Sequence, residues 1–204
     1  MFITLEGGEG AGKSTQARLL AEALAAAGDQ VLCTREPGGA PGAEILRGLL
    51  VSRDHDWSPV AEIYLHFAAR AEHIARTIQP ALARGEVVIS DRFADSTMAY
   101  QGYGLGADRA LIAALTGLLP VRPDLTIVLQ ASPRIAAHRI VARHQALDRY
   151  EAMSTAFHAR VADGFATIAA AEAGRCVVVS ADASVDDVHR AVLAIVADRR
   201  SHAG

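Results

Sequence analysis

The chain has 204 residues, of which 51% are hydrophobic and 21% charged, and its formal net charge is −3. This length suits one globular domain, and the composition excludes a disordered chain, a coiled coil and a strongly basic nucleic-acid-binding protein. The 20 basic residues comprise 19 arginines and a single lysine, Lys13.

Five short runs rich in β-branched residues are predicted to be strands. In chain order they cover residues 2–6, 30–34, 86–90, 125–129 and 175–179. Because the runs are almost continuously apolar, both faces of each strand are expected to be covered.

Helical patterns fill the intervals between these runs. The predicted helices cover residues 13–27, 43–51, 59–83, 108–119, 133–143, 150–173 and 184–199. Regular alternation of strand and helix predicts an α/β fold with a parallel sheet covered on both faces by helices. Ligands are then expected at the carboxyl ends of the strands.

Residues 7–14 read GGEGAGKS and fit the P-loop pattern of glycine, four residues, glycine, lysine and serine or threonine. The motif follows a predicted strand and opens a predicted helix, which is the context that phosphate binding requires. Lys13 would reach the β- and γ-phosphate oxygens of a nucleotide, and the Ser14 hydroxyl would be a ligand of Mg²⁺. The compact ammonium of a lysine fits this tight loop, whereas the planar guanidinium of an arginine is too wide for it.

Asp91 directly follows the third predicted strand, at the same edge of the sheet as the P-loop. A carboxylate in this position is typical of a Walker B aspartate, which holds Mg²⁺ directly or through water. Ser14 and Asp91 are therefore the predicted metal-binding residues.

Several arginines lie near the expected ends of strands or on the helices between them, namely Arg35, Arg47, Arg70 and Arg92. Two anionic substrates held together need positive charge beyond a P-loop lysine and Mg²⁺. The pattern favours a phosphoryl acceptor that is itself a phosphate. Such an oxygen is already ionised, so no general base is required.

The motifs together resemble bacterial thymidylate (dTMP) kinases, and the resemblance spans nearly the whole chain. They are TREPGG at residues 34–39, DRF at 91–93, STMAYQG at 96–102, RPDLT at 122–126 and LDR at 147–149. The resemblance implies that dTMP is phosphorylated to dTDP by the γ-phosphoryl group of ATP, a step in dTTP biosynthesis. It also implies a five-stranded P-loop kinase fold, a single domain over residues 1–204, and a homodimer.

The resemblance assigns three sets of site residues. Catalytic residues would be Glu9, Lys13, Arg92, Arg143 and Arg149. ATP-binding residues would be Gly7, Gly8, Glu9, Gly10, Ala11, Gly12, Lys13, Ser14 and Thr15. The dTMP-binding residues would be Glu9, Arg35, Glu36, Arg47, His66, Arg70, Arg92, Thr97, Tyr100 and Gln101.

Within the dTMP set, Arg35 and Arg92 would hold the phosphate, with Arg47 in support. The guanidinium of Arg70 would donate to thymine O4, and Gln101 would read the Watson–Crick edge of the base, with Thr97 nearby.

On the sugar side, Tyr100 would occupy the space of a ribose 2′-hydroxyl and so favour deoxyribose. Glu9 would accept from the 3′-hydroxyl or lie near the metal, with Glu36 on the same side.

Residues 139–149 resemble the LID of the family, a flap that closes over ATP. In members whose P-loop lacks an arginine, as here, this segment supplies the catalytic arginine. Arg143 and Arg149 are the candidates.

Two residues are candidates for stacking on thymine, where the family usually has a phenylalanine. Either His66 stacks on the base or a local shift brings Phe67 to it.

Two other functions compete with a dTMP kinase. A deoxynucleoside kinase would phosphorylate a neutral hydroxyl and would need a carboxylate base such as Glu36. A nucleotide-dependent regulatory protein would bind ATP without an acceptor.

No secretory signal or membrane span is apparent, so a cytoplasmic protein without membrane or nucleic-acid partners is expected. Cys33 and Cys176 lack metal spacing and are expected to be buried thiols.

Overall fold

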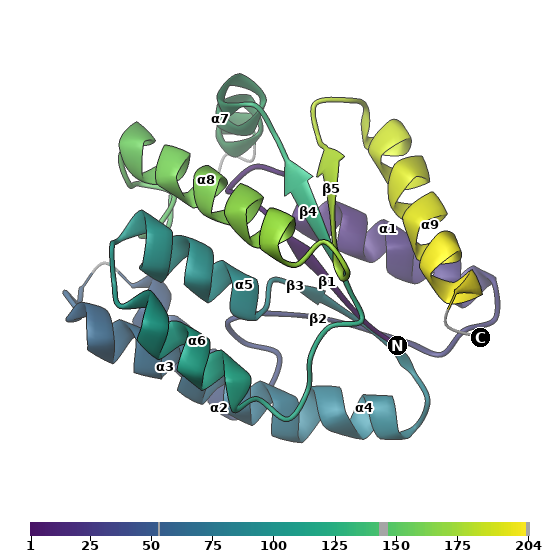
Figure 1. Ribbon diagram of the computed structural model, residues 1–204, viewed down its shortest axis with the longest axis horizontal. Helices are drawn as coiled ribbons and strands as arrows, with labels where there is room; N and C mark the ends of the chain where they lie inside the picture. The colour runs from purple at the N-terminus through teal and green to yellow at the C-terminus, as the bar shows by residue number, and fades with distance from the viewer. Residues whose placement is uncertain (53, 143–146, 203–204) are drawn as a thin grey trace.

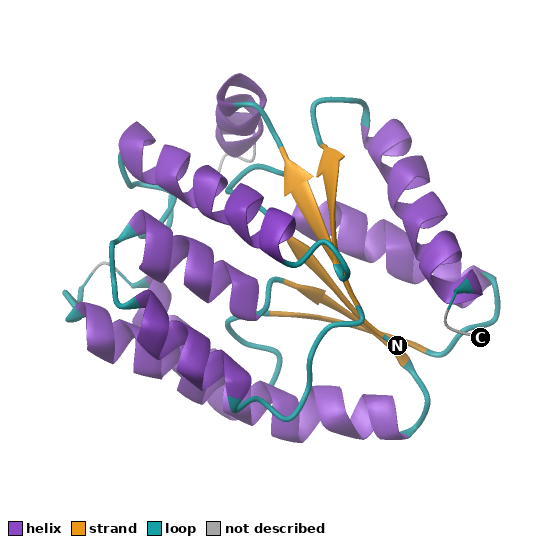
Figure 2. Ribbon diagram, viewed as in Figure 1, coloured by secondary structure: helices purple, strands orange, loops and turns teal. Residues whose placement is uncertain are grey.

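A computed structural model of the protein describes residues 1–52, 54–142 and 147–202. At its centre is a parallel sheet in the order β2-β3-β1-β4-β5 (Figure 1). The strands are β1 (Phe2–Glu6), β2 (Val31–Arg35), β3 (Val87–Asp91), β4 (Leu125–Gln130) and β5 (Cys176–Ser180). Each boundary lies within one residue of its predicted position, and the predicted five-stranded parallel sheet flanked by helices is confirmed (Figure 2).

Alternate residues of the central strand point to opposite layers of helices. On one side, Ile3 and Leu5 of β1 pack against α1 (Lys13–Ala26) and α9 (Val185–Ser201). On the other side, Phe2 packs against residues of η1 and α4, and Val128 of β4 packs against α8. Burial on both faces explains why the strand runs are almost continuously apolar.

The remaining helical elements follow in chain order. They are α2 (Pro41–Val51), α3 (Pro59–His73), η1 (Ile74–Ile78), α4 (Gln79–Ala83), α5 (Ala94–Thr97), η2 (Met98–Gly104), α6 (Arg109–Gly117), α7 (Pro133–Ala142) and α8 (Thr155–Ala171). The predicted helix over residues 59–83 is continuous in the structure, as α3, η1 and α4, but the five residues of η1 have π-helical geometry.

Two helical predictions need correction. Helix α8 begins at Thr155 rather than at Tyr150, because the hydroxyl of Ser154 caps it by accepting from the Phe157 N–H at 3.2 Å. Residues 94–104 are helical, as α5 and η2, although no helix was predicted there. Their glycines obscured the pattern, yet Gly104 is required because a Cβ there would lie 2.6 Å from the Phe157 ring.

The surface also differs from expectation at one cysteine. Cys33 is exposed, whereas Cys176 is buried as expected. The reason is topological: β2 is an edge strand, so its residues are less covered than those of β1 and β3. Within the three described ranges, no helix is long and apolar enough to cross a membrane.

Candidate active site

The P-loop joins β1 to α1, and Lys13 is the first residue of that helix. Gly10 and Gly12 adopt positive φ angles of 70° and 92°, which only glycine tolerates readily, and α1 directs its N-terminus toward the loop. The Lys13 side chain is buried, and its Nζ donates to the carbonyl of Gly8 at 2.7 Å. Burial and the charge of Arg92 lower the pKa of Lys13 to about 8.

Asp91 lies beside the P-loop because β1 and β3 are neighbours, with Leu5 paired to Asp91 in the sheet register. The Ser14 hydroxyl donates to the Asp91 carboxylate at 2.5 Å. The structure therefore brings the two predicted metal-binding residues together. Both offer oxygen, the ligand that Mg²⁺ prefers.

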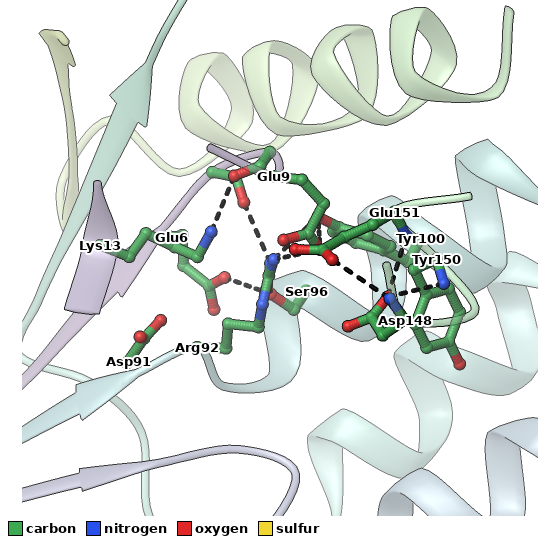
Figure 3. Close-up of polar contacts among 12 residues, drawn as sticks. Glu6, Glu9, Lys13, Asp91, Arg92, Ser96, Tyr100, Asp148, Tyr150 and Glu151 are labelled. Atoms are coloured by element: carbon green, nitrogen blue, oxygen red, sulfur yellow. Dashed lines mark hydrogen bonds and ion pairs between the residues drawn. The ribbon is translucent and has the colours of Figure 1, made fainter. Parts of the chain in front are cut away.

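Arg92 follows β3 and holds the P-loop to the opposite wall of the site (Figure 3). Its guanidinium donates to Glu9 Oε1 at 2.7 Å, to the Tyr100 hydroxyl at 2.9 Å and to the carbonyl of Gly7 at 3.0 Å. Its backbone φ of 71° lies in the left-handed region, which is strained for a residue with a Cβ. Burial opposes the charge on Arg92, but the charges of Glu9 and its neighbours raise the pKa above its ordinary value.

Glu6, at the end of β1, supports the turn after Arg92. Its carboxylate accepts from the Phe93 N–H at 2.8 Å and from the Ser96 hydroxyl at 2.5 Å. Burial, together with the charge of Asp95, raises the pKa of Glu6 to about 8. This buried carboxyl group ties β1 to the start of α5, and so positions the backbone on either side of the site.

A cavity of about 720 Å³ extends from the P-loop to the helices that follow β3. Most of the predicted site residues line it. They are Glu9, Gly10, Ala11, Gly12, Lys13, Ser14, Thr15, Arg35, Glu36, Arg47, His66, Arg70, Asp91, Arg92, Thr97, Tyr100 and Gln101. Gly7 and Gly8 instead contribute backbone carbonyls that accept from Arg92 and Lys13.

Arg70 forms one wall at the far end of this cavity and is buried. Its Nε donates to Glu36 at 2.7 Å, and its Nη2 donates to the Phe93 carbonyl and to the Thr97 hydroxyl, each at 3.0 Å. The remaining nitrogen, Nη1, is buried without a hydrogen-bond partner among the described residues. A fixed, unused donor thus remains in a cavity wall.

Gln101 also lines the cavity, and the atom that the described residues leave unpaired is here an acceptor rather than a donor. Its Nε2 donates to Glu62 Oε1 at 2.8 Å and to the Tyr150 hydroxyl at 3.2 Å. Within the described part of the chain, its buried Oε1 has no hydrogen-bond partner. Arg70 and Gln101 thus carry a buried donor and a buried acceptor that no described residue pairs, and both residues line the cavity.

The structure distinguishes the two residues considered for stacking. His66 lines the cavity, whereas Phe67 packs with Ile63 and Ile112 in a separate apolar cluster. Burial and the charge of Arg70 lower the pKa of His66 to about 3, so the imidazole is neutral. A neutral ring on the cavity wall can present its face to a base.

The arginines expected at the acceptor phosphate also line the cavity. Arg35 is partly exposed and pairs with Glu44 at 3.1 Å, and Arg47 donates to the Pro37 carbonyl at 2.9 Å. Burial and the charge of Arg35 lower the pKa of Arg47, as expected for cations crowded around a site for an anion.

The described arginines of the expected LID contact two different parts of the site. Arg143 lies outside the described residues. Arg149 pairs with Glu62 Oε2 at 2.8 Å and lies over the Tyr150 ring. Arg139 contacts the P-loop: its guanidinium donates to the Ala181 carbonyl at 2.8 Å and lies 3.5 Å from the Gly10 carbonyl.

Sequence reasoning missed a polar row along α3. Glu62, His66, Arg70 and His73 are spaced by four, four and three residues, so they lie on one face of the helix. All four are buried. The Nδ1 atom of His73 is hydrogen-bonded to Glu36 Oε1 at 3.0 Å, whereas Arg70 donates to the other carboxylate oxygen, Oε2. Polar residues at helical spacing between apolar ones were the signal that could have revealed Glu62 and His73.

Comparisons with known proteins agree with this architecture. A family model described as thymidylate kinase matches residues 5–192. A thymidylate kinase of Gluconobacter oxydans is 53% identical over 200 residues, 96% of this chain and 94% of that protein. One from Caulobacter vibrioides is 52% identical over 204 residues, 97% and 96% of the two chains. The crystal structure of thymidylate kinase from Ehrlichia chaffeensis matches with a TM-score of 0.79 at 37% identity, over 96% of this chain and 97% of that one.

Proposed function

This chain belongs to the thymidylate kinase family and phosphorylates dTMP with ATP, and we propose which of its described residues bind the base, the sugar, the phosphates and the metal ion. The observation that carries the proposal is the pair of unused polar atoms at the far end of the cavity, Nη1 of Arg70 and Oε1 of Gln101. Thymine offers an acceptor at O4 and a donor at N3–H on adjacent positions. One fixed donor and one fixed acceptor in the wall match this edge.

The base would be held between that polar wall and the neutral ring of His66. Histidine offers less apolar area than phenylalanine but can still stack when uncharged. Because burial and the charge of Arg70 lower the pKa of His66 to about 3, the ring stays uncharged near neutral pH. His66 rather than Phe67 is therefore the proposed stacking residue.

The sugar would lie against Tyr100 and Glu9. The Tyr100 hydroxyl donates to Glu9 at 2.8 Å and accepts from Arg92, so the phenol is held in place. A ring fixed there would leave no room for a ribose 2′-hydroxyl, which favours a deoxynucleotide. Glu9 would accept from the 3′-hydroxyl.

The acceptor phosphate would bind Arg35 and Arg92, supported by Arg47. An ionised phosphate oxygen attacks the γ-phosphorus, the bond from that phosphorus to the β–γ bridging oxygen breaks, and ADP leaves. No proton has to be removed from the nucleophile. This fits Glu36, whose two carboxylate oxygens are already engaged by Arg70 and His73, which makes it a poor general base.

At the ATP side, the P-loop amides and Lys13 would bind the β- and γ-phosphates. Ser14 and Asp91 would hold Mg²⁺, directly or through water. The bound ion would neutralise charge that develops on the phosphate oxygens. Among the described residues no cluster of three or more His, Cys, Asp or Glu could hold a metal, so its other ligands would be phosphate oxygens and water.

Arg92 is the proposed catalytic arginine within the described site, because its guanidinium lies between the P-loop and the residues assigned to dTMP. Arg143 and Arg149 remain predictions for the LID contribution. The described contacts of Arg149 place it on Glu62, so a catalytic role would require it to leave that partner.

A homodimer is proposed from the family and from exposed apolar side chains. Ile45 of α2 and Tyr64 of α3 are 71% and 52% exposed, on helices that pack together. Light scattering coupled to size exclusion measures the mass directly, and a monomer at micromolar concentration would contradict the proposal.

Release of ADP in a coupled assay tests the function. Wild-type enzyme is supplied with ATP, Mg²⁺ and, in separate reactions, dTMP, dUMP, dCMP or thymidine. We expect strong stimulation by dTMP and little by dCMP or thymidine. Stimulation by thymidine instead would identify a deoxynucleoside kinase, and ATP binding without any acceptor dependence would identify a regulatory protein.

A further inference from the structure

We propose that Glu62 is a positioning residue that determines which atom of the Gln101 amide faces the pyrimidine, and that it thereby selects a base with hydrogen on N3. The inference rests on the proposed function, because it assumes that Gln101 reads the base. It adds a residue that does not touch the substrate but acts through Gln101.

Glu62 lies in the first turns of α3 and is 1% exposed. Its Oε1 accepts from Gln101 Nε2 at 2.8 Å and from the Tyr150 hydroxyl at 2.8 Å. Its Oε2 pairs with Arg149 at 2.8 Å. One buried carboxylate thus joins three segments that are far apart in the chain.

The partners of an amide decide which of its two ends is oxygen and which is nitrogen. An ionised carboxylate only accepts, so the end of the Gln101 amide that faces Glu62 is the NH₂ group. The Tyr150 hydroxyl gives its only proton to Glu62, so it too must accept from Gln101. Both neighbours therefore require NH₂ on this side, and the amide oxygen is left at the other end, without a partner among the described residues.

The opposite rotamer would bring Gln101 Oε1 against Glu62 Oε1, two acceptors in a buried site. It would lose the hydrogen bonds to both partners and would direct NH₂ at the base. Arg149 pairs with the other carboxylate oxygen of Glu62, so both oxygens of this side chain already have partners. The orientation of Gln101 is in this way fixed before any substrate binds.

This orientation discriminates between bases. Thymine and uracil carry hydrogen on N3 and can donate to Oε1 of Gln101. Cytosine has a lone pair on N3, which would face that oxygen and find no donor. Because a buried site that pairs poorly with a substrate rejects it strongly, the fixed amide contributes to selectivity for dTMP over dCMP.

Glu62→Gln is the informative substitution, since it has nearly the same shape. Arg149 only donates, so the new amide is expected to turn its oxygen toward Arg149 and its NH₂ toward Gln101 and Tyr150. Gln101 would then rotate and present NH₂ to the base. The substitution reverses the whole network and does more than weaken it.

The assay is the steady-state rate of ADP release with dTMP, dUMP and dCMP as acceptors. For Glu62→Gln we expect kcat/KM to fall about tenfold or more for dTMP, through KM, and by the same factor for dUMP, which has the same N3–H edge. The ratio of kcat/KM for dTMP to that for dCMP should fall at least about tenfold, while KM for ATP is unchanged. Glu72→Gln is the matched control, because Glu72 forms an exposed pair with Arg76 on the same helix; its ratios should equal those of wild type.

Two results would overturn the inference while leaving the proposed function intact. One is an unchanged dTMP-to-dCMP ratio in a folded Glu62→Gln enzyme, and the other is unequal loss for dTMP and dUMP, which would indicate general disturbance of the pocket. If this variant does not fold, the double variant Glu62→Leu/Arg149→Met decides: it removes both members of the buried ion pair together, which a buried site tolerates better than the loss of one, and it leaves no carboxylate to hold the Gln101 amide. An unchanged dTMP-to-dCMP ratio in that variant contradicts the inference equally. Failure of wild-type enzyme to phosphorylate dTMP would instead refute the proposed function itself.

Discussion

Raising the pH from 7 to 9 is expected to weaken the capture of ATP about tenfold, because Lys13 loses its proton in this range. Burial, followed by the charge of Arg92, lowers the pKa of Lys13 from 10.5 to about 8. The ammonium form would then fall from roughly 90% to roughly 10% of the free enzyme between these pH values, whereas an unperturbed lysine would stay almost fully protonated. Only the ammonium can pair with the phosphates.

The measurement is kcat/KM for ATP at saturating dTMP between pH 6.5 and 10. We expect the profile to bend near pH 8 and then to fall by one decade per pH unit. In contrast, kcat should stay flat through pH 9, because bound phosphates raise the pKa of Lys13 in the complex. A flat kcat/KM profile through pH 9 would refute the assignment of Lys13 to the phosphates.

Chemical labelling gives an independent readout, since Lys13 is the only lysine in the chain. Acylation of its amine, followed by peptide mapping to separate it from the terminal amine, should rise with pH with a midpoint near 8. Saturating ATP should protect against both labelling and inactivation. A midpoint near 10.5, or no protection, would contradict the burial argument or the assignment respectively.

The same pKa shift predicts how stability depends on pH. Because the pKa of Lys13 is lower in the folded state than in the unfolded state, the charged group destabilises the fold below about pH 8. Lowering the pKa of Lys13 from 10.5 to about 8 corresponds to about 3 kcal/mol, and this penalty vanishes as the pH rises to 10.5. Lys13→Met should therefore abolish activity yet stabilise the free enzyme by up to about 3 kcal/mol at pH 7, with no gain near pH 10.5. Chemical denaturation at the two pH values measures both, and a loss of stability at pH 7 would contradict the sign.

Three further predictions concern other parts of the site. Arg70→Lys replaces the guanidinium by a single ammonium, which cannot hold Glu36 and donate to the base in the same fixed geometry, so KM for dTMP should rise on the order of a hundredfold while KM for ATP does not. An unchanged KM for dTMP would remove Arg70 from base recognition. Gly104→Ala would place a Cβ 2.6 Å from the Phe157 ring, so the free energy of unfolding should fall by about 1–3 kcal/mol, whereas Gly117→Ala meets open space and should cost nothing; equal thermal midpoints of the two variants would contradict this. Arg139→Ala removes contacts to the P-loop, so KM for ATP should rise several-fold with KM for dTMP constant, and the reverse pattern would place Arg139 elsewhere in the reaction.

Local patterns were sufficient for the sheet and the P-loop. A run of buried β-branched residues predicts a strand wherever it pairs, so all five strands lie within one residue of their predicted positions. Where local signals conflict, prediction failed: η2 contains glycines that favour turns, yet α5 and η2 are both helical, and Glu6, 90 residues before Ser96, holds the first turn of α5 in place. Similarly, the start of α8 depended on which residue caps it, and Ser154 does so.

The sequence by itself determined the reaction class, because the P-loop, Lys13 and the arginines after the strands are recognisable from type and spacing alone. Only the tertiary structure decided how the base is read. Glu62 meets Gln101 across 39 residues and Tyr150 across 88 residues of chain, and no local spacing encodes a contact between elements so far apart. Hydrogen bonds between α3, η2 and the segment before α8 leave Nη1 of Arg70 and Oε1 of Gln101 without partners among the described residues, and the placement of these two atoms arises from folding rather than from any motif.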